Sequence, residues 1–123
     1  MEFKGAVPIL RIFDEDKAKE FYLSFLEFSL DWEHRYEADF PLYAQVSKGG
    51  CVLHLSEHHG DCTPGSAIRI EVENAKAWQE RLLAKQYGYA RPGFSEEWNA
   101  VQVTDPFGNR LHFYSEKKEQ DKC

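Results

Sequence analysis

The hydrophobic pattern near the start of the chain predicts a strand followed by a helix. Apolar residues spaced i, i+3, i+4 and i+7 form one helical stripe, and Asp14 can cap the N-terminus, so we expect a helix over about residues 15–26. The stripe consists of Ala18, Phe21, Tyr22 and Phe25. The segment VPILRIF before it is rich in branched residues and follows Gly5, which is typical of a strand.

Three more strands are expected in the first half of the chain. Strand-like runs lie near residues 28–36, 41–48 and 50–56. Lys48-Gly49-Gly50 separates the last two runs and indicates a tight hairpin. The first half therefore has the order β-α-β-β-β.

The same order begins again in the second half. The segment SAIRIEVENAKAWQERLLAKQYG predicts a strand and then a helix that is capped by Asn74 and stops near Gly88. A short strand is expected between residues 89 and 95. The segments EWNAVQVTD and RLHFYSE alternate as strands and are joined by the turn DPFGN. The two copies open with ILRI and AIRI, about 58 residues apart.

This doubled order predicts an α+β fold in a single domain of 123 residues, which is long enough to bury a core. We place module 1 at about residues 4–58 and module 2 at about residues 66–115. A Gly-, Thr- and Pro-containing linker at about residues 59–65 joins them. The charged tail at residues 116–123 is expected to fray.

Strand alternation predicts a second, outward face on each sheet. Side chains of a strand point to its two faces in turn, so burying the apolar set against the helices leaves a mixed set on the other face. That set includes Val52, His54, Ser56, Ala67, Arg69, Glu71, Trp98, Ala100, Gln102, Thr104, Arg110, His112 and Tyr114. It is too polar for a core and too aromatic for an ordinary surface, which favours the wall of an amphipathic cavity.

The composition of the chain limits which classes of molecule it is expected to bind. Fifteen basic and 21 acidic residues give a formal net charge of −6, which disfavours nucleic acids and anionic membranes and mildly favours a cationic ligand. The sequence has no membrane-length apolar run and no signal-peptide pattern, so a cytoplasmic location is expected. Its three cysteines lack a CxxC spacing and are expected to be reduced thiols.

Several motifs together resemble one family. The doubled order, the segment DEDKAKEFYLSFLEF and the turn DPFGN resemble the vicinal oxygen chelate superfamily, which has the glyoxalase and dioxygenase fold. LHLSEHHGDCTPG, Trp98 and DPFGNRLHFY are similar to its bleomycin resistance protein branch. The resemblance covers about residues 4–115. It implies that the two β-α-β-β-β modules form a curved mixed-sheet cup with the helices on the convex face.

The resemblance also implies a vestigial metal site. The metal enzymes of the superfamily take one ligand from each of four strands, and these positions carry over by motif to Val7, His54, Ala67 and His112. Only the two histidines can bind a metal, whereas a catalytic site normally has three protein ligands. We therefore expect no metal and no cofactor. His58 or His59 could complete a site only if the loop after residue 56 folded into the cup.

The leading functional hypothesis is a non-catalytic homodimer that sequesters a large, planar, cationic antibiotic of the bleomycin and phleomycin type and so confers resistance. The resemblance implies that the partner chain completes the groove. The expected ligand-binding residues are Trp32, Phe40, Tyr43, His54, Ser56, Arg69, Trp98, Gln102 and His112. Two alternatives stay open: a metal-dependent enzyme of the glyoxalase and dioxygenase kind, and a carrier for another small aromatic metabolite.

Overall fold

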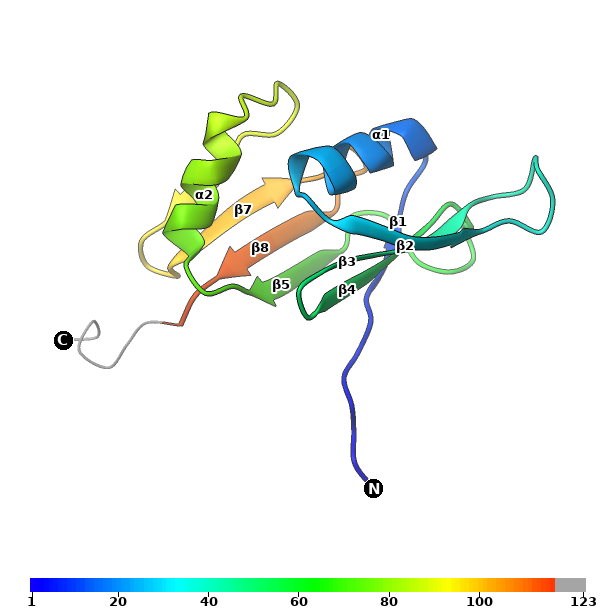
Figure 1. Cartoon of the computed structure of the whole chain (residues 1–123), viewed down its shortest axis with the longest axis horizontal. Coiled ribbons are helices and arrows are strands. Elements are labelled where there is room, and N and C mark those ends of the chain that lie inside the picture. Colours follow the sequence, from blue (N-terminus) through cyan, green and yellow to red (C-terminus); the bar gives the residue numbers. More distant parts are fainter. Residues whose placement is uncertain (117–123) are drawn as a thin grey trace.

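The computed structural model describes residues 1–116, and the rest of the charged tail, residues 117–123, lies outside the described part. The first half of the chain folds in the predicted order (Figure 1). We call this half module 1. Its elements are β1 (Ile9–Arg11), α1 (Glu15–Lys19), a π-helical continuation η1 (Glu20–Phe25), β2 (Ser29–His34), β3 (Tyr43–Lys48) and β4 (Cys51–Ser56).

The second half repeats the order and is called module 2. Its elements are β5 (Ala67–Glu71), α2 (Ala75–Ala84), β6 (Gly93–Ser95), β7 (Ala100–Thr104) and β8 (Arg110–Tyr114). The two expected hairpin signals are confirmed, since Lys48 pairs with Cys51 around a left-handed Gly49 and Thr104 pairs with Arg110 around the DPFGN turn.

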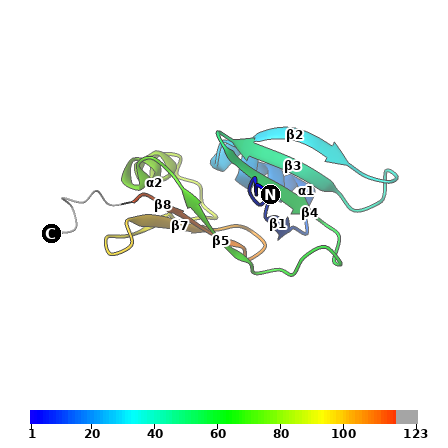
Figure 2. The ribbon, with the colours of Figure 1, turned by 90° about the horizontal axis from the view of Figure 1, so that it is seen from below.

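The two modules form two equivalent four-stranded sheets. Their strand orders are β1-β4-β3-β2 and β5-β8-β7-β6. β1 is parallel to β4 and β5 is parallel to β8, while the other neighbouring pairs are antiparallel. The sheets lie side by side with both helices over one face (Figure 1 and Figure 2). The predicted α+β fold is confirmed, and the face opposite the helices is left open in each sheet.

Both helices begin where the sequence predicts. The side chains of Asp14 and Asn74 accept hydrogen bonds from the backbone N–H groups of Lys17 and Ala77, at 2.9 and 3.0 Å. The predicted stop at Gly88 is wrong. Helix α2 ends at Ala84, and Gln86 takes a left-handed conformation with φ of 52°.

One hydrophobic core spans both modules. It combines residues of α1, η1 and α2 with the helix-facing residues of the strands. The predicted alternation is confirmed in β7 and β8, where Val101, Val103, Leu111 and Phe113 are all buried. The open faces of the sheets are consequently defined by the residues that alternate with this core.

The DPFGN turn connects the two modules through buried polar contacts. The carboxylate of Asp105 accepts hydrogen bonds from the Tyr22 hydroxyl at 2.6 Å and from the backbone N–H groups of Phe107 and Asn109 at 2.9 and 2.8 Å. The side-chain amide of Asn109 donates both to Asp105 and to the backbone carbonyl of Arg11, each at 2.8 Å. Burial, followed by the Asp105 charge, raises the pKa of Tyr22, which keeps the phenol protonated as the donor.

A second connection lies at the surface beside the helices. Glu27 lies 2.7 Å from both Arg81 and Lys85 of module 2 and 3.5 Å from Lys48 of module 1. The hydrogen bonds from Arg81 and then Lys85 lower the pKa of Glu27 to about 2. Lys85 also donates to the carbonyl groups at the end of η1, so the same cluster helps to end that helix.

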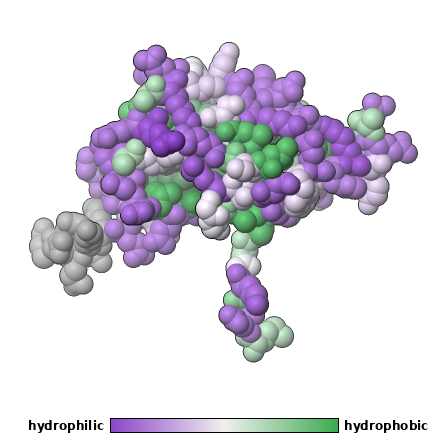
Figure 3. Space-filling model, in the orientation of Figure 1, coloured by the Kyte–Doolittle hydropathy of each residue, from purple (hydrophilic) through white to green (hydrophobic). Residues whose placement is uncertain are grey.

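Among the described residues, no helix is both long and apolar enough to cross a membrane. The face of the molecule seen in Figure 1 is hydrophilic over most of its area, and apolar side chains gather near its middle (Figure 3).

Replacing Tyr22 with phenylalanine should lower the free energy of unfolding by about 1.5–3 kcal/mol, because the buried Asp105 carboxylate loses a hydrogen-bond donor. Tyr36 is 78% exposed, so Tyr36→Phe is the matched control and should change stability by less than about 0.5 kcal/mol. Urea unfolding of both variants measures this difference. Equal stabilities would contradict the assigned role of the Tyr22–Asp105 contact.

Glu27→Gln should destabilise the protein by about 1 kcal/mol above pH 4.5, because a partly exposed carboxylate loses its ion pairs. The folded-state pKa of Glu27 is below its ordinary value, so its contribution is present above pH 4.5 and is lost as the pH falls toward about 2. The stability difference between wild type and variant should therefore close over that window in urea titrations. Glu80→Gln, which changes an exposed glutamate on α2, is the control. A stability difference between wild type and Glu27→Gln that persisted unchanged at the acid limit would contradict the account.

Candidate functional site

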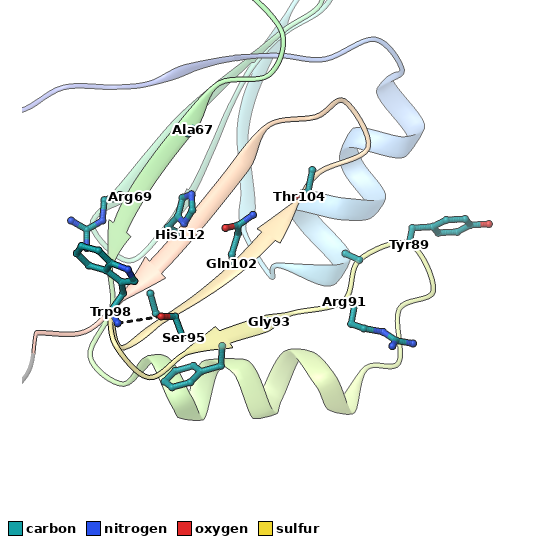
Figure 4. Close-up of a pocket in the computed structure, with 13 residues that line it drawn as sticks. Ala67, Arg69, Tyr89, Arg91, Gly93, Ser95, Trp98, Gln102, Thr104 and His112 are labelled. Carbon is teal, nitrogen blue, oxygen red and sulfur yellow. Dashed lines mark hydrogen bonds between the residues drawn. The ribbon is translucent and has the colours of Figure 1, made fainter.

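A cavity of about 990 Å³ lies on the open face of module 2 (Figure 4). Four of the expected ligand-binding residues line it: Arg69, Trp98, Gln102 and His112. Strands β5, β8 and β7 supply its floor, and the segment from Tyr89 to Trp98 supplies one side. Every lining residue belongs to module 2.

Strand register sets a row of nitrogen-bearing side chains across the cavity floor. Arg69 pairs with His112 across β5 and β8, and His112 pairs with Gln102 across β8 and β7. Directly paired residues point to the same face, about 5 Å apart. Figure 4 shows the three side chains side by side on the open face. A guanidinium, an imidazole and an amide can all present N–H donors to a bound molecule.

Aromatic groups lie at one end of this row. Trp98 is 65% exposed and lines the same cavity as Arg69, and its backbone N–H donates to the Ser95 hydroxyl at 3.2 Å (Figure 4). The Arg69 guanidinium stacks 4.1 Å from the centre of the Tyr114 ring, a cation–π contact. The cavity therefore combines a flat apolar surface with directional polar groups, as small-molecule sites commonly do.

A different set of expected residues clusters on the open face of module 1. The His54 ring nitrogens lie 2.7 Å from the Tyr43 hydroxyl and 3.0 Å from the Gln45 side-chain oxygen. Gln45 in turn donates to Asp31 at 3.0 Å. The Trp32 ring packs edge-on against His54 and parallel to Tyr43. With both ring nitrogens paired, His54 has a fixed orientation.

Charge and burial shift the ionisation of this second cluster. Burial raises the pKa of Tyr43, and the nearby Asp61 and Cys62 add to the rise, so the phenol stays neutral. Hydrogen bonds from Gln45 and then Ser47 lower the pKa of Asp31, which favours its carboxylate form. The module 1 face therefore carries an anionic group.

One detail of the expected site is wrong. Ser56 does not face the cavity: it is fully buried, its hydroxyl donates to Asp61 at 2.7 Å, and it accepts from the His58 backbone N–H at 3.0 Å. The loop after β4 thus buries Ser56 on the face that alternation assigns to the outside.

Phe40 belongs neither to the module 2 cavity nor to the module 1 cluster. It is 44% exposed in the loop between β2 and β3, where its ring is 6.4 Å from that of Tyr36. This loop projects away from the body of the molecule (Figure 1). The structure thus divides the nine expected residues among the module 2 cavity, the module 1 cluster, the loop holding Phe40 and the buried Ser56.

Four contributors were missed by the sequence interpretation. Tyr89 and Arg91 line the module 2 cavity from the segment after α2, which is too irregular for alternation to assign a face. Gln45 joins the module 1 cluster because it pairs with His54 across β3 and β4, and strand alternation from Tyr43 could have assigned it to this face. Asp31, which accepts from Gln45, lies at a register shift between Leu30 and Trp32, and a bulge of this kind leaves no clear signal in the sequence.

The four family metal positions do not form a donor set. Val7 and Ala67 have no side-chain donor, and the remaining positions, His54 and His112, lie on different sheets. In residues 1–116, no three His, Cys, Asp or Glu side chains are grouped closely enough to hold a metal ion, and this includes His58 and His59. The arrangement supports no reaction step through a bound metal.

A second cavity of about 870 Å³ lies between the modules, beside the first residues of β4 and the outer edge of β5. Its walls are mainly apolar and include Trp78, whose indole N–H is buried without a hydrogen-bond partner among the described residues. The cation of Lys48 lies 5.5 Å from the Trp78 ring. No expected site residue other than Arg69 lines this cavity.

Comparisons with known proteins agree with this architecture. A bleomycin-binding protein from Streptomyces verticillus, solved with copper(II)-bleomycin, is 28% identical, with a TM-score of 0.70 over 95% of this chain and 99% of that one. An antibiotic-binding protein from a Streptomyces species is 18% identical, with a TM-score of 0.66 over 95% and 100% of the two chains. A lactoylglutathione lyase from Agrobacterium tumefaciens shares the fold at 13% identity and a TM-score of 0.71, over 94% and 96%.

No curated protein matches the sequence. The model of the family described as "Glyoxalase superfamily protein" matches residues 1–121, which is nearly the whole chain. With the doubled modules, this match confirms the resemblance that the sequence motifs suggested, and the chain belongs to the glyoxalase superfamily.

Proposed function

We propose that the protein binds and sequesters a flat aromatic antibiotic of the bleomycin and phleomycin type in the cytoplasm, without chemical conversion. The observation that carries this proposal is the pair of open sheet faces, each presenting an exposed tryptophan among polar side chains. The 28% identity to a bleomycin-binding protein over 95% of the chain supports the choice of ligand. Stacking a ligand ring on each tryptophan would contribute about 0.5–1.5 kcal/mol beyond the buried area.

The chemistry of the site favours binding over catalysis. Of the four positions that supply metal ligands in enzymes of this superfamily, two are apolar here, Val7 and Ala67. The imidazole of His54 is held by Tyr43 and Gln45 and so is not free to accept a proton from a substrate. Polar groups on the module 2 face instead have the geometry to orient a ligand.

We further propose that the binding groove forms across a homodimer. In one chain the module 2 cavity receives no residue from the Trp32, Tyr43 and His54 cluster. That cluster lies on an open sheet face, where Trp32 is 43% exposed. A second copy that set its module 1 face over the module 2 cavity would bring the two half-sites together and cover both aromatic surfaces. The net charge of −6 would then favour encounter with a cationic drug.

Bleomycin should bind the purified protein with a dissociation constant in the micromolar range or below, at two sites per dimer, with or without bound copper. Removing either aromatic platform, by Trp98→Ala or Trp32→Ala, should weaken binding roughly 10- to 100-fold, because each indole supplies both stacking and buried area. Isothermal titration calorimetry gives affinity and stoichiometry.

Leu83→Ala removes an exposed apolar side chain from α2, away from both faces, and is the control for these variants. Affinity that is unchanged in both tryptophan variants would contradict the proposed site. If bleomycin does not bind while other flat aromatic molecules still quench tryptophan fluorescence, the ligand is another small aromatic metabolite and not the antibiotic.

Sedimentation equilibrium should give about twice the 14.3 kDa mass of the chain at micromolar concentration. Trp32→Glu should shift the protein toward the monomer, since a charge would then be buried in the dimer without a partner. Lys17→Glu, a charge change on the exposed side of α1, should leave the dimer intact. A monomeric wild-type protein would contradict the shared groove.

A further inference from the structure

The module 2 cavity is positively charged, although the protein as a whole is acidic. Its charged lining residues are Arg69 and Arg91, and no aspartate or glutamate lines it. Arg110, which pairs with Ala67 and Thr104, and Glu71, which pairs with Tyr114, lie on the same face of the sheet outside the cavity lining. The acids nearest in sequence to Trp98, Glu96 and Glu97, are not part of the lining.

These cations are not neutralised within the described part of the chain. The ion pairs of residues 1–116 involve Arg35, Arg81 and three lysines, and none includes Arg69, Arg91 or Arg110. The Arg69 guanidinium is fixed instead over the Tyr114 ring, a contact that leaves its edge N–H groups available to a ligand.

The geometry favours one class of ligand group. The planar fork of an arginine matches a carboxylate, sulfonate or phosphate, and the adjacent His112 and Gln102 extend the same row with further donors. Trp98, which lines the same cavity as Arg69, supplies a surface for a flat ring (Figure 4). A ligand that stacks on Trp98 while its acceptor group lies over the row would satisfy both features.

We infer that the module 2 cavity binds a planar aromatic ring that carries an anionic group, with Arg69 as the residue that selects the charge. This inference concerns the cavity used in the proposed function and goes beyond that function, because an anionic ring is a ligand class other than the cationic antibiotic. In the proposed dimer, any cationic part of that ligand would lie toward the module 1 face of the second copy. That face carries the carboxylate of Asp31. The site is thereby polarised, with positive charge in one half and negative charge in the other.

Three naphthalene derivatives of equal shape test the inference: naphthoate, naphthamide and naphthylmethylammonium. In calorimetric titrations at neutral pH and low salt, naphthoate should bind roughly tenfold more tightly than naphthamide and naphthylmethylammonium more weakly still, since like charges then meet at Arg69. Added salt should weaken the binding of naphthoate and leave that of naphthamide unchanged. This salt comparison uses the wild-type protein and does not depend on the folding of a variant.

Arg69→Gln should remove the preference for naphthoate, whereas Arg69→Lys should keep part of it, because the charge remains and the fork is lost. Lys17→Gln makes the same change in net charge on the exposed side of α1 and should keep the whole preference. Equal affinities for the three compounds, tighter binding of the ammonium compound, a preference that survives Arg69→Gln, or no binding of any of them would overturn the inference.

A parallel titration with bleomycin separates this inference from the proposed function. Bleomycin binding without a preference for naphthoate overturns only the charge selection by Arg69. A preference for naphthoate without bleomycin binding supports the charge selection and overturns only the antibiotic.

Discussion

The buried carboxylate of Asp105 is the contact on which the arrangement of the two modules depends. It accepts four hydrogen bonds, from Tyr22 of module 1 and from three groups of its own turn, all at 2.6–2.9 Å. A buried carboxylate is tolerated only when its acceptor capacity is satisfied, so η1, which carries Tyr22, and the β7–β8 turn must lie together. Asn109 extends the contact to the backbone of β1. The contact thus holds the helix of module 1 against the sheet of module 2.

This dependence explains which parts of the fold the sequence could predict. Periodicity was sufficient to predict both helices and eight strands, and a buried surface confirms the apolar stripe or alternation in most of them, although β2 is exposed along its whole length. The DPFGN segment was predicted as a turn, but its role as the contact between modules needs Tyr22, which is 83 residues away. The end of α2 was wrong because Gln86, and not a glycine, takes the left-handed conformation.

The site was predictable to the extent that strand alternation continues undisturbed. In β5, β7 and β8 it does, and Arg69, Gln102 and His112 line one cavity. In module 1 two irregularities intervene: a register shift in β2 lies at Asp31, which accepts a hydrogen bond from Gln45, and the loop after β4 covers Ser56. Family motifs identified the superfamily and gave no indication that the two open faces differ in charge. That difference arises from which residues the strand register places together.

The central claim is that the Trp98 face of one chain and the Trp32 face of another bind one ligand between them. A crystal structure of the protein with copper-loaded bleomycin tests this claim most directly. The account predicts flat ligand rings stacked against Trp98 of one subunit and Trp32 of the partner subunit, with acceptor atoms of the ligand over Arg69. A ligand bound within a single chain, for example in the apolar cavity beside Trp78, would contradict it.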